Sequence, residues 1–357
     1  MTRADAVRVL VVGDPYMPAT VYTQALARLG DDVAVSTLQI ETAAASPPRT
    51  ESEHRLREYV GDPAEIARAV AGHDVIIVHG AAVSAEVLDA APLRLVSCAR
   101  GGPVNVDVAA ATDRGIPVAN TPGKNAEAVA ELTLAFALLL LRKVPSASRH
   151  LLEGGAFTES VFDGREYFGR EAAGVTVGLV GLGHVGREVA PRAQALGFRV
   201  IASDPWISDA EVGDVEVVRL DDLLARSDIV SLHARATQEN RHMFSRAEFA
   251  RMRPGALLIN TARESLVDEQ ALLEALEQGL VAGAALDVVE HPPAGTSHPL
   301  LRMPNVLVTP HIGGATAETL SRGARVAVAA VADLIAARAP SPLVNPEVLR
   351  DVRVAGS

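Results

Sequence analysis

The stretch TVGLVGLGHVGREVA (176–190) decides the fold, because it places Gly181, Gly183 and Gly186 in the spacing G-x-G-x-x-G between an apolar strand and a helix. In such a turn the first glycine permits a tight reversal of the chain. The second lets backbone N–H groups approach a pyrophosphate, and the third lets the helix pack close to the strand. The N-terminus of the helix adds partial positive charge. The pattern predicts a dinucleotide site.

A second strand, RVIASD (199–204), follows the helix and ends at Asp204. We expect the Asp204 carboxylate to accept hydrogen bonds from the ribose hydroxyls of the adenosine. Its charge would repel a 2′-phosphate, and the next residues, Pro205 and Trp206, provide no arginine to neutralise one. The cofactor predicted here is therefore NAD. The alternative is a glycine-rich turn in a fold without a nucleotide, with Asp204 as a plain cap.

Length and composition indicate a folded protein of two domains. The chain has 357 residues, of which 48% are apolar, and a net charge of -11. The negative charge argues against nucleic acid or an anionic membrane as the partner. The apolar segment 126–141 is interrupted by Glu127 and Glu131, so we expect a buried helix and no membrane span. Cys98 is the one cysteine, which favours a reducing compartment, the cytoplasm.

Short apolar runs alternate with helical patterns along the whole chain, which predicts parallel βαβ units and an α/β fold. We interpret the chain as two α/β domains. The last long helix, at about 315–338, follows the final strand of the second domain and has no strand of its own to accompany. We therefore expect it to return to the N-terminal domain, with the second domain inserted into the first.

Polar residues follow five predicted strands, and ligands of open α/β sheets bind beyond the carboxyl ends of strands. These residues are His233 in SLHARAT, Asn260, Thr261 and Arg263 in LINTARES, Asp287 in ALDVVEHPP, His311 in LVTPHIGGAT, and Arg100, Gly101 and Gly102 in CARGGPVN.

Hydride transfer on an alcohol or ketone needs a group that exchanges the hydroxyl proton and a cation that holds the substrate. His311 is the histidine in a glycine-rich, helix-starting setting, and histidine is the side chain that titrates near neutral pH. Arg263 offers a planar fork for a carboxylate, and the N–H groups of Gly101 and Gly102 can bind the same group. Each residue alone has a structural interpretation; their joint placement at strand ends favours a site.

The chain resembles the D-2-hydroxyacid dehydrogenases of the phosphoglycerate and formate dehydrogenase type over nearly its whole length. The stretches that carry the resemblance are ARGGPVNVD (99–107), NTPGKNAEAVAE (120–131), TVGLVGLGHVGREVA (176–190), DIVSLHARAT (228–237), RPGALLINTARESLVDEQALLEAL (253–276), GAALDVV (283–289) and PNVLVTPHIGGAT (304–316). The resemblance implies two Rossmann-like domains with parallel sheets. A flavodoxin-like substrate domain would comprise 1–123 and 312–357, and an NAD-binding domain inserted into it would comprise 124–311.

The resemblance also implies roles for individual residues. Arg263 would orient the carboxylate and carbonyl of the substrate, His311 would be the general acid/base, and Arg100, Gly101 and Gly102 would help to bind the substrate. The helix from about 126 and the arm after it would form the contact of a homodimer. No metal is expected. The implied cofactor positions are Gly181, Gly183, His184, Val185, Gly186, Asp204, His233, Thr261, Ala262, Asp287 and Gly314.

One catalytic position departs from the family. The family pairs its histidine with a glutamate five places beyond the aspartate of LDV, and here that place is Pro292. Either Glu290 replaces the glutamate through a rearranged loop, or His311 acts without a carboxylate. An unpaired imidazole lacks the charge that favours its protonated form and the group that fixes its ring. The two prolines stiffen the loop, which favours the unpaired histidine.

The function predicted is that of an NAD-dependent oxidoreductase that interconverts a D-2-hydroxy acid and the corresponding 2-oxo acid. The alternatives are an NAD(H)-sensing, corepressor-like binding protein without turnover, and a dehydrogenase specialised for a phosphorylated or sugar-derived acid. The sequence carries no readable code for the substrate side chain or for the physiological direction.

Overall fold

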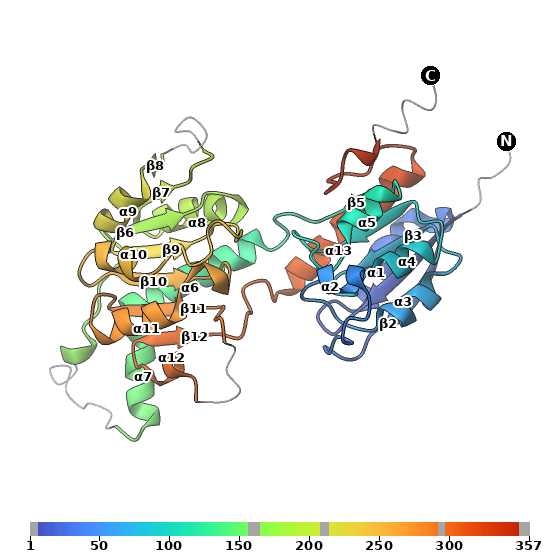
Figure 1. The fold of residues 1–357 in the computed structure, drawn as a ribbon. Helices are drawn as coiled ribbons and strands as arrows, with labels where there is room; N and C mark the ends of the chain where they lie inside the picture. Colours follow the sequence, from blue (N-terminus) through green and yellow to red (C-terminus); the bar gives the residue numbers. More distant parts are fainter. Residues whose placement is uncertain (1–5, 156–164, 208–213, 292–296, 350–357) are drawn as a thin grey trace. The chain divides into compact units, whose positions relative to one another are not determined.

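The computed structural model describes residues 6–155, 165–207, 214–291 and 297–349. The chain divides into two compact units, Met1–Lys124 with Thr316–Ser357 (unit 1) and Asn125–Ala315 (unit 2). Each unit is a parallel sheet with helices beside it (Figure 1), as an α/β fold requires. Among the described residues no helix is both long enough and apolar enough to cross a membrane.

Unit 1 is built on a five-stranded parallel sheet in the order β2-β1-β3-β4-β5. The chain order reverses between β1 and β3, which makes this the topological switch point of the sheet. The strands are β1 (Val7–Gly13), β2 (Val33–Gln39), β3 (Val75–Val78), β4 (Leu95–Cys98) and β5 (Val118–Ala119). The helices are α1 (Ala19–Leu26), 3-10 helix η1 (Ala27–Asp32), α2 (Glu51–Arg55), α3 (Pro63–Val70), α4 (Ala85–Asp89), α5 (Val108–Asp113) and α13 (Ala317–Ile335).

Both faces of the unit 1 sheet are covered, which is why β3 and β4 are buried at every residue, without the alternation of a half-exposed strand. On one face α1 and α13 pack against β1, β3 and β4. Ser97 of β4 donates its hydroxyl to the carbonyl of Ala327 in α13 at 2.9 Å. The last helix therefore belongs to the N-terminal unit, as an inserted second domain requires.

Unit 2 carries a seven-stranded parallel sheet in the order β12-β11-β10-β9-β6-β7-β8. Its switch point lies between β6 and β9. The strands are β6 (Thr176–Val180), β7 (Arg199–Ser203), β8 (Glu216–Val217), β9 (Ile229–Leu232), β10 (Leu257–Asn260), β11 (Gly283–Leu286) and β12 (Val306–Val308). The helices are α6 (Ala126–Leu141), α7 (Val144–Leu152), 3-10 helix η2 (Arg165–Tyr167), α8 (His184–Ala195), α9 (Leu220–Arg226), α10 (Arg246–Arg251), 3-10 helix η4 (Glu264–Leu266), α11 (Glu269–Glu277) and α12 (Pro299–Arg302).

Helix α6 explains why one segment of the sequence is apolar on almost every side. It packs against α8 and against β10 and β11, and its buried side chains include Phe136, Leu140 and Leu141. The helix is thus a core element of unit 2, which fits its strongly apolar sequence.

Candidate functional site

The three glycines of the β6–α8 turn have three different physical roles. Gly181 has a φ of +96°, and a Cβ there would lie 2.7 Å from the backbone nitrogen of Ala234 after β9. A Cβ on Gly186 would lie 2.4 Å from the carbonyl oxygen of Gly181. Gly183, in contrast, would meet nothing within 4 Å. Gly181 and Gly186 are therefore required for packing, whereas Gly183 leaves the backbone open to a ligand at the start of α8.

Asp204, directly after β7, braces this turn. Its Oδ2 accepts a hydrogen bond from the backbone N–H of Leu182 at 2.8 Å, and its Oδ1 accepts from the N–H of Trp206 at 2.9 Å. The residue is half-buried, and each carboxylate oxygen keeps a further lone pair. His184 and Val185 form the first turn of α8 beside it. The predicted adenosine residues thus lie together at the carboxyl edge of the sheet.

His233 directly follows β9 (Ile229–Leu232) at the switch point of unit 2. Its backbone N–H donates to the carbonyl of Val180, and its Nε2 lies 2.9 Å from the hydroxyl of Ser231. Its Nδ1 is buried and has no hydrogen-bond partner. Burial lowers the pKa of His233 to about 4, so the ring is neutral at pH 7. An orphaned polar atom beside the glycine turn fits a polar group of a bound cofactor.

The loop after β10 is fixed by a buried amide. Asn260 accepts from the N–H of Ala262 at 3.0 Å and donates to the carbonyl of Arg263 at 2.9 Å. Thr261 is tied to α6 by a hydroxyl contact of 2.9 Å with Thr133. The guanidinium of Arg263 is exposed and donates to the carbonyl of Ala262 at 2.7 Å. No acidic side chain of the described residues pairs with it, so this rigid loop presents an uncompensated cation.

Asp287, after β11, organises the loop that carries His311. The carboxylate is buried and accepts from the hydroxyl of Thr309 at 2.6 Å and from the N–H groups of Ile312 and Gly313 at 2.8 and 2.7 Å. A Cβ on Gly313 would lie 2.8 Å from Oδ2 of this carboxylate. The carbonyl of Asp287 accepts from the N–H of His311 at 2.9 Å. Asp287 therefore holds both flanks of the histidine.

His311 itself is exposed and adopts a left-handed backbone with a φ of 58°. This conformation is uncommon for a residue with a Cβ and is typical of functional sites. In the described part of the chain no side chain forms a hydrogen bond with the ring. Its orientation is therefore imposed through the main chain of the 309–313 loop. The position of Pro292 lies outside the described residues.

Glu290 lies in a different set of contacts. Its carboxylate accepts from Arg241 at 2.7 Å and lies 2.8 Å from Nε2 of His242. Its backbone N–H donates to Glu269 at 2.9 Å. His242 also has a left-handed backbone, with a φ of 54°. The described contacts thus hold Glu290 between two basic side chains and do not pair it with His311.

The substrate residues expected in unit 1 lie after β4. Arg100 donates to the carbonyl of Glu58 at 2.8 Å and to its carboxylate. The loop is braced by Asn120, which donates to the carbonyl of Gly101 at 2.7 Å. Gly101 and Gly102 are exposed, and no hydrogen bond among the described residues uses their N–H groups. These amides are therefore available to a carboxylate.

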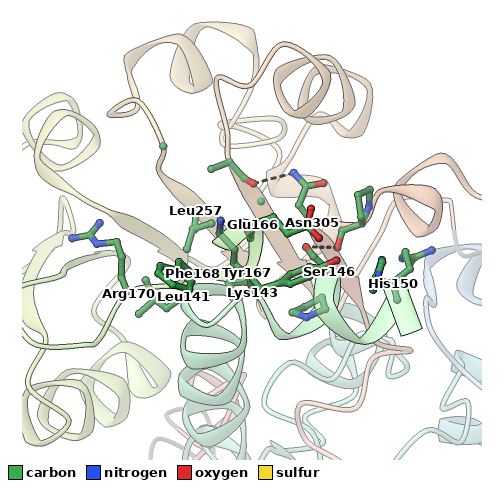
Figure 2. Close-up of a pocket in the computed structure, with 18 of the residues that line it drawn as sticks. Leu141, Lys143, Ser146, His150, Glu166, Tyr167, Phe168, Arg170, Leu257 and Asn305 are labelled. Carbon is green, nitrogen blue, oxygen red and sulfur yellow. Dashed lines mark hydrogen bonds between the residues drawn. The ribbon is translucent and has the colours of Figure 1, made fainter. Parts of the chain in front are cut away.

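A pocket of about 660 Å³ lies at the opposite edge of unit 2, near the amino ends of β9 to β12 (Figure 2). It is lined by α7 and the segment around η2. Lys143 donates to the carbonyl of Glu166, and Ser146 donates to the carbonyl of Pro304, each at 2.9 Å. Asn305 likewise donates to a carbonyl. These three polar side chains are thus engaged within the unit, and the pocket is remote from the glycine turn at the carboxyl edge.

Comparison with known proteins identifies the family. The sequence model of the D-isomer specific 2-hydroxyacid dehydrogenase NAD binding domain matches residues 134–313. The chain belongs to this family. It is 36% identical over 304 residues to a glyoxylate reductase of Thermofilum pendens, covering 83% of this chain and 88% of the reductase. The solved structure of D-2-hydroxyisocaproate dehydrogenase superposes with a TM-score of 0.80 at 25% identity, covering 95% of this chain and all of that one.

A D-3-phosphoglycerate dehydrogenase of Archaeoglobus fulgidus is 41% identical over 258 residues, which are 71% of this chain but 48% of that protein. The chain spans about half the length of the phosphoglycerate dehydrogenases that it matches. The resemblance noted from the motifs is confirmed at the level of the family and its fold.

Three residues that hold the site together lie outside the set of site residues predicted from the sequence. Asn260 was noted only as a polar strand end, yet it fixes the Arg263 loop. Thr309 and Gly313 hold the His311 loop against Asp287. Their signal was present in LVTPHIGGAT, where a hydroxyl and two adjacent glycines flank the histidine.

Proposed function

We propose that the chain is an NAD-dependent oxidoreductase that interconverts a D-2-hydroxy acid and the corresponding 2-oxo acid. The observation that carries the proposal is the loop of His311. Asp287 fixes this loop at the same sheet edge as the glycine turn and the unpaired guanidinium of Arg263. An acid/base group and a cation beside a dinucleotide motif are the parts that this chemistry requires.

In this proposal, different residues of the protein bind the substrate and transfer the proton. Arg263 binds the carboxylate and polarises the carbonyl of the 2-oxo acid, and in unit 1 the N–H groups of Gly101 and Gly102 offer hydrogen-bond donors for a carboxylate. His311 gives a proton to the carbonyl oxygen during reduction and takes the hydroxyl proton during oxidation. NAD, when bound, supplies the hydride acceptor or donor. The neutral ring of His233 provides a polar contact that does not change charge near pH 7.

We propose NAD as the cofactor on the chemistry of the residues that would hold it. Gly183 is open to a pyrophosphate, and Asp204 carries a negative charge where a 2′-phosphate would otherwise lie. Asp287, Thr261, Ala262 and Gly314 belong to the part of the edge assigned to the nicotinamide.

We further propose that His311 works without a carboxylate partner. Glu290 is held by Arg241 and His242, and its release would break an ion pair. The competing interpretation, that Glu290 replaces the family glutamate, requires this cluster to open. The two interpretations differ in the pH dependence of catalysis.

The exposed apolar side chains of unit 2 support a homodimer. Five of those that the structure describes lie on the C-terminal part of α6, on α7 and after η2, namely Leu138, Val144, Leu151, Leu152 and Phe168, whereas Leu196, Trp206, Leu280 and Ile312 lie elsewhere in the unit. Leu152 is 85% exposed. Such a set is typical of a contact surface. We propose the cytoplasm as the compartment, because the one cysteine is a buried thiol.

The test of this function is NADH consumption with a panel of 2-oxo acids, followed by chiral analysis of the product. A D-2-hydroxy acid formed with NADH in clear preference to NADPH supports the proposal. Binding of NADH without turnover of any acid would instead favour a nucleotide-sensing binding protein.

A further inference from the structure

A second polar cluster lies at the carboxyl edge of the unit 1 sheet, at its switch point. Asp14 follows β1 and His79 follows β3, and Nδ1 of His79 lies 3.1 Å from Oδ2 of Asp14. Tyr16 stacks on His79 with ring centroids 4.8 Å apart. Ligands of open parallel sheets bind at this position. The cluster therefore lies at the edge of the unit 1 sheet where a parallel α/β sheet is expected to bind a ligand.

The Asp14 carboxylate accepts hydrogen bonds from its neighbours and holds the cluster in place. Besides His79, its carboxylate accepts from the N–H groups of Tyr16, Met17 and Gly80 at 2.7 to 2.9 Å. Burial raises the pKa of Asp14, but these hydrogen bonds outweigh burial and hold it below its usual value. Because Nδ1 must donate to this carboxylate, Nε2 of His79 carries the lone pair when the ring is neutral. No described residue engages Nε2.

Lys124 is the unexplained member of the cluster. It is 8% exposed, and its Nζ is buried without any hydrogen-bond partner. The centroid of the Tyr16 ring lies 5.8 Å from Nζ. The methylene stem packs on α13, where a Cβ on Gly323 would come within 3.1 Å of Cδ. A buried, unpaired ammonium is unfavourable unless a ligand compensates its charge.

The loop of Lys124 adjoins the amides that would bind the substrate carboxylate. The N–H of Thr121 donates to the carbonyl of Arg100 at 2.9 Å. A Cβ on Gly101 would lie 3.7 Å from Cα of Pro122. The loops after β4 and β5 are therefore packed against each other within unit 1. A substrate held by the Gly101 and Gly102 amides would have its remote end close to the 121–124 loop.

We propose that Lys124, backed by His79, forms a subsite for a second oxyanion of the substrate, a carboxylate or a phosphate at the end remote from the 2-oxo acid group. This inference rests on the proposed dehydrogenase function and narrows its substrate class. The favoured substrates are dicarboxylic or phosphorylated 2-oxo acids and the hydroxy acids derived from them. Lys124 supplies the positive charge, and Nε2 of His79 takes up a proton when the oxyanion arrives.

The charges around Lys124 are consistent with an anion site. Burial, together with the charge of Arg100, lowers the pKa of Lys124 to about 8, against the opposing effect of Cys98 and Asp14. Burial and the charges of Lys124 and Arg100 likewise lower the pKa of His79, against the effect of Asp14. From α13, Arg322 donates to the carbonyl of Lys124. A bound oxyanion would raise both pKa values.

The first test compares substrates that differ only in remote charge. The isosteric pair is 2-oxoglutarate and 2-oxoglutaramate, and the phosphate pair is 3-phosphohydroxypyruvate and hydroxypyruvate. The charged member of at least one pair should have the higher kcat/KM. Lys124→Met should reduce the ratio of kcat/KM within that pair by about 10- to 100-fold, the loss expected for a charged hydrogen bond. Lys143→Met, which changes an exposed lysine of unit 2, is the matched control and should leave the ratio unaltered.

Because Lys124 can lose its proton, the same comparison of substrates should depend on pH. Above pH 8 Lys124 loses its proton, so KM for the charged substrate should rise between pH 7 and pH 9 while KM for its neutral partner should not. Equal ratios in the wild type and in Lys124→Met, or parallel pH profiles, would overturn the subsite while leaving the dehydrogenase proposal intact.

The second test does not depend on turnover. The chain contains two lysines, Lys124 and Lys143. Labelling with ¹³C-lysine therefore gives two side-chain signals. Lys143→Met assigns them. Addition of 2-oxoglutarate, 3-phosphohydroxypyruvate or inorganic phosphate should shift the Lys124 signal and raise its titration midpoint, and 2-oxoglutaramate should not. An unresponsive Lys124 signal would contradict the subsite even in a protein that oxidises NADH. A responsive signal without turnover would instead contradict the dehydrogenase proposal alone.

Discussion

His311 donates its backbone N–H to the carbonyl oxygen of Asp287 at 2.9 Å, so the histidine is tied to the aspartate through the main chain. The Asp287 carboxylate meanwhile binds the N–H groups of Ile312 and Gly313 just beyond it. These contacts orient the imidazole through the backbone, and none of them is made to the ring itself. Asp287 is therefore a positioning residue for His311 in addition to its expected place near the nicotinamide.

The substitution Asp287→Asn tests the role of Asp287 in positioning His311. The amide keeps the shape but replaces one accepting oxygen by a donor, which would oppose an N–H or a hydroxyl. Leaving buried donors unsatisfied costs about 1–3 kcal/mol, which should lower the free energy of unfolding of unit 2. Displacement of the loop should also reduce kcat. Thr309→Val removes one of the contacts and serves as the milder comparison in urea unfolding and steady-state assays. Unchanged stability and kcat in Asp287→Asn would contradict the positioning role.

Arg263→Lys should lower kcat/KM by about 10- to 100-fold or more, because lysine lacks the planar fork that binds carboxylate and carbonyl together. The affinity for NADH should remain, since the Arg263 side chain contacts only its own loop in the described structure. Fluorescence titration with NADH and steady-state kinetics on one 2-oxo acid measure the two effects. A variant with the wild-type kcat/KM would rule out the carboxylate clamp.

The pH profile decides between an unpaired His311 and a replacement by Glu290. If His311 acts alone, Glu290→Gln should leave the pH dependence of kcat/KM superimposable on that of the wild type. If Glu290 moves to the histidine, the same change should depress kcat and displace the profile. Arg241→Gln is the control for disruption of the cluster, because Arg241 is 57% exposed and binds the same carboxylate.

The lowered pKa of His233 predicts that unit 2 becomes less stable at acidic pH. Its folded pKa of about 4 lies below the usual value of 6.5, so the unfolded chain binds more protons between these values. Stability is fully present above pH 6.5 and is lost as the pH falls toward 4. The free energy of unfolding should fall by about 2 kcal/mol between pH 7 and pH 5 from this residue. Urea unfolding without cofactor should show a shallower pH dependence in His233→Asn. An identical dependence would contradict a neutral buried ring.

The strands were largely predictable from sequence because buried parallel strands are continuous apolar runs. The apolar run VRVLVVG (7–13) forms β1 along its whole length, and the glycine turn predicted the β6–α8 junction. Strand β8 (Glu216–Val217) was not predicted, because two residues carry no periodic signal and pairing with β7 defines the strand. The family and its parallel α/β architecture were likewise predicted from motifs at strand ends.

Side-chain partners could not be predicted in the same way, because they join distant residues. Asp287 contacts residues up to 26 positions away, and Glu290 meets Arg241 across 49 positions. The family resemblance offered Glu290 as one of two alternatives at His311 and carried no sign of its basic neighbours. The role of Lys124 could not be predicted from its motif NTPGKNAEAVAE, since burial and the lack of a partner are properties of packing.

The most direct test of the account is NADH consumption by the purified protein with the best 2-oxo acid of the panel, measured beside His311→Ala. If His311 is the general acid/base, the wild type should turn over this acid and the variant should lose about 100- to 10,000-fold in kcat, the range for a general acid, with NADH binding retained. Equal turnover by the two proteins would contradict the assignment of proton transfer to His311.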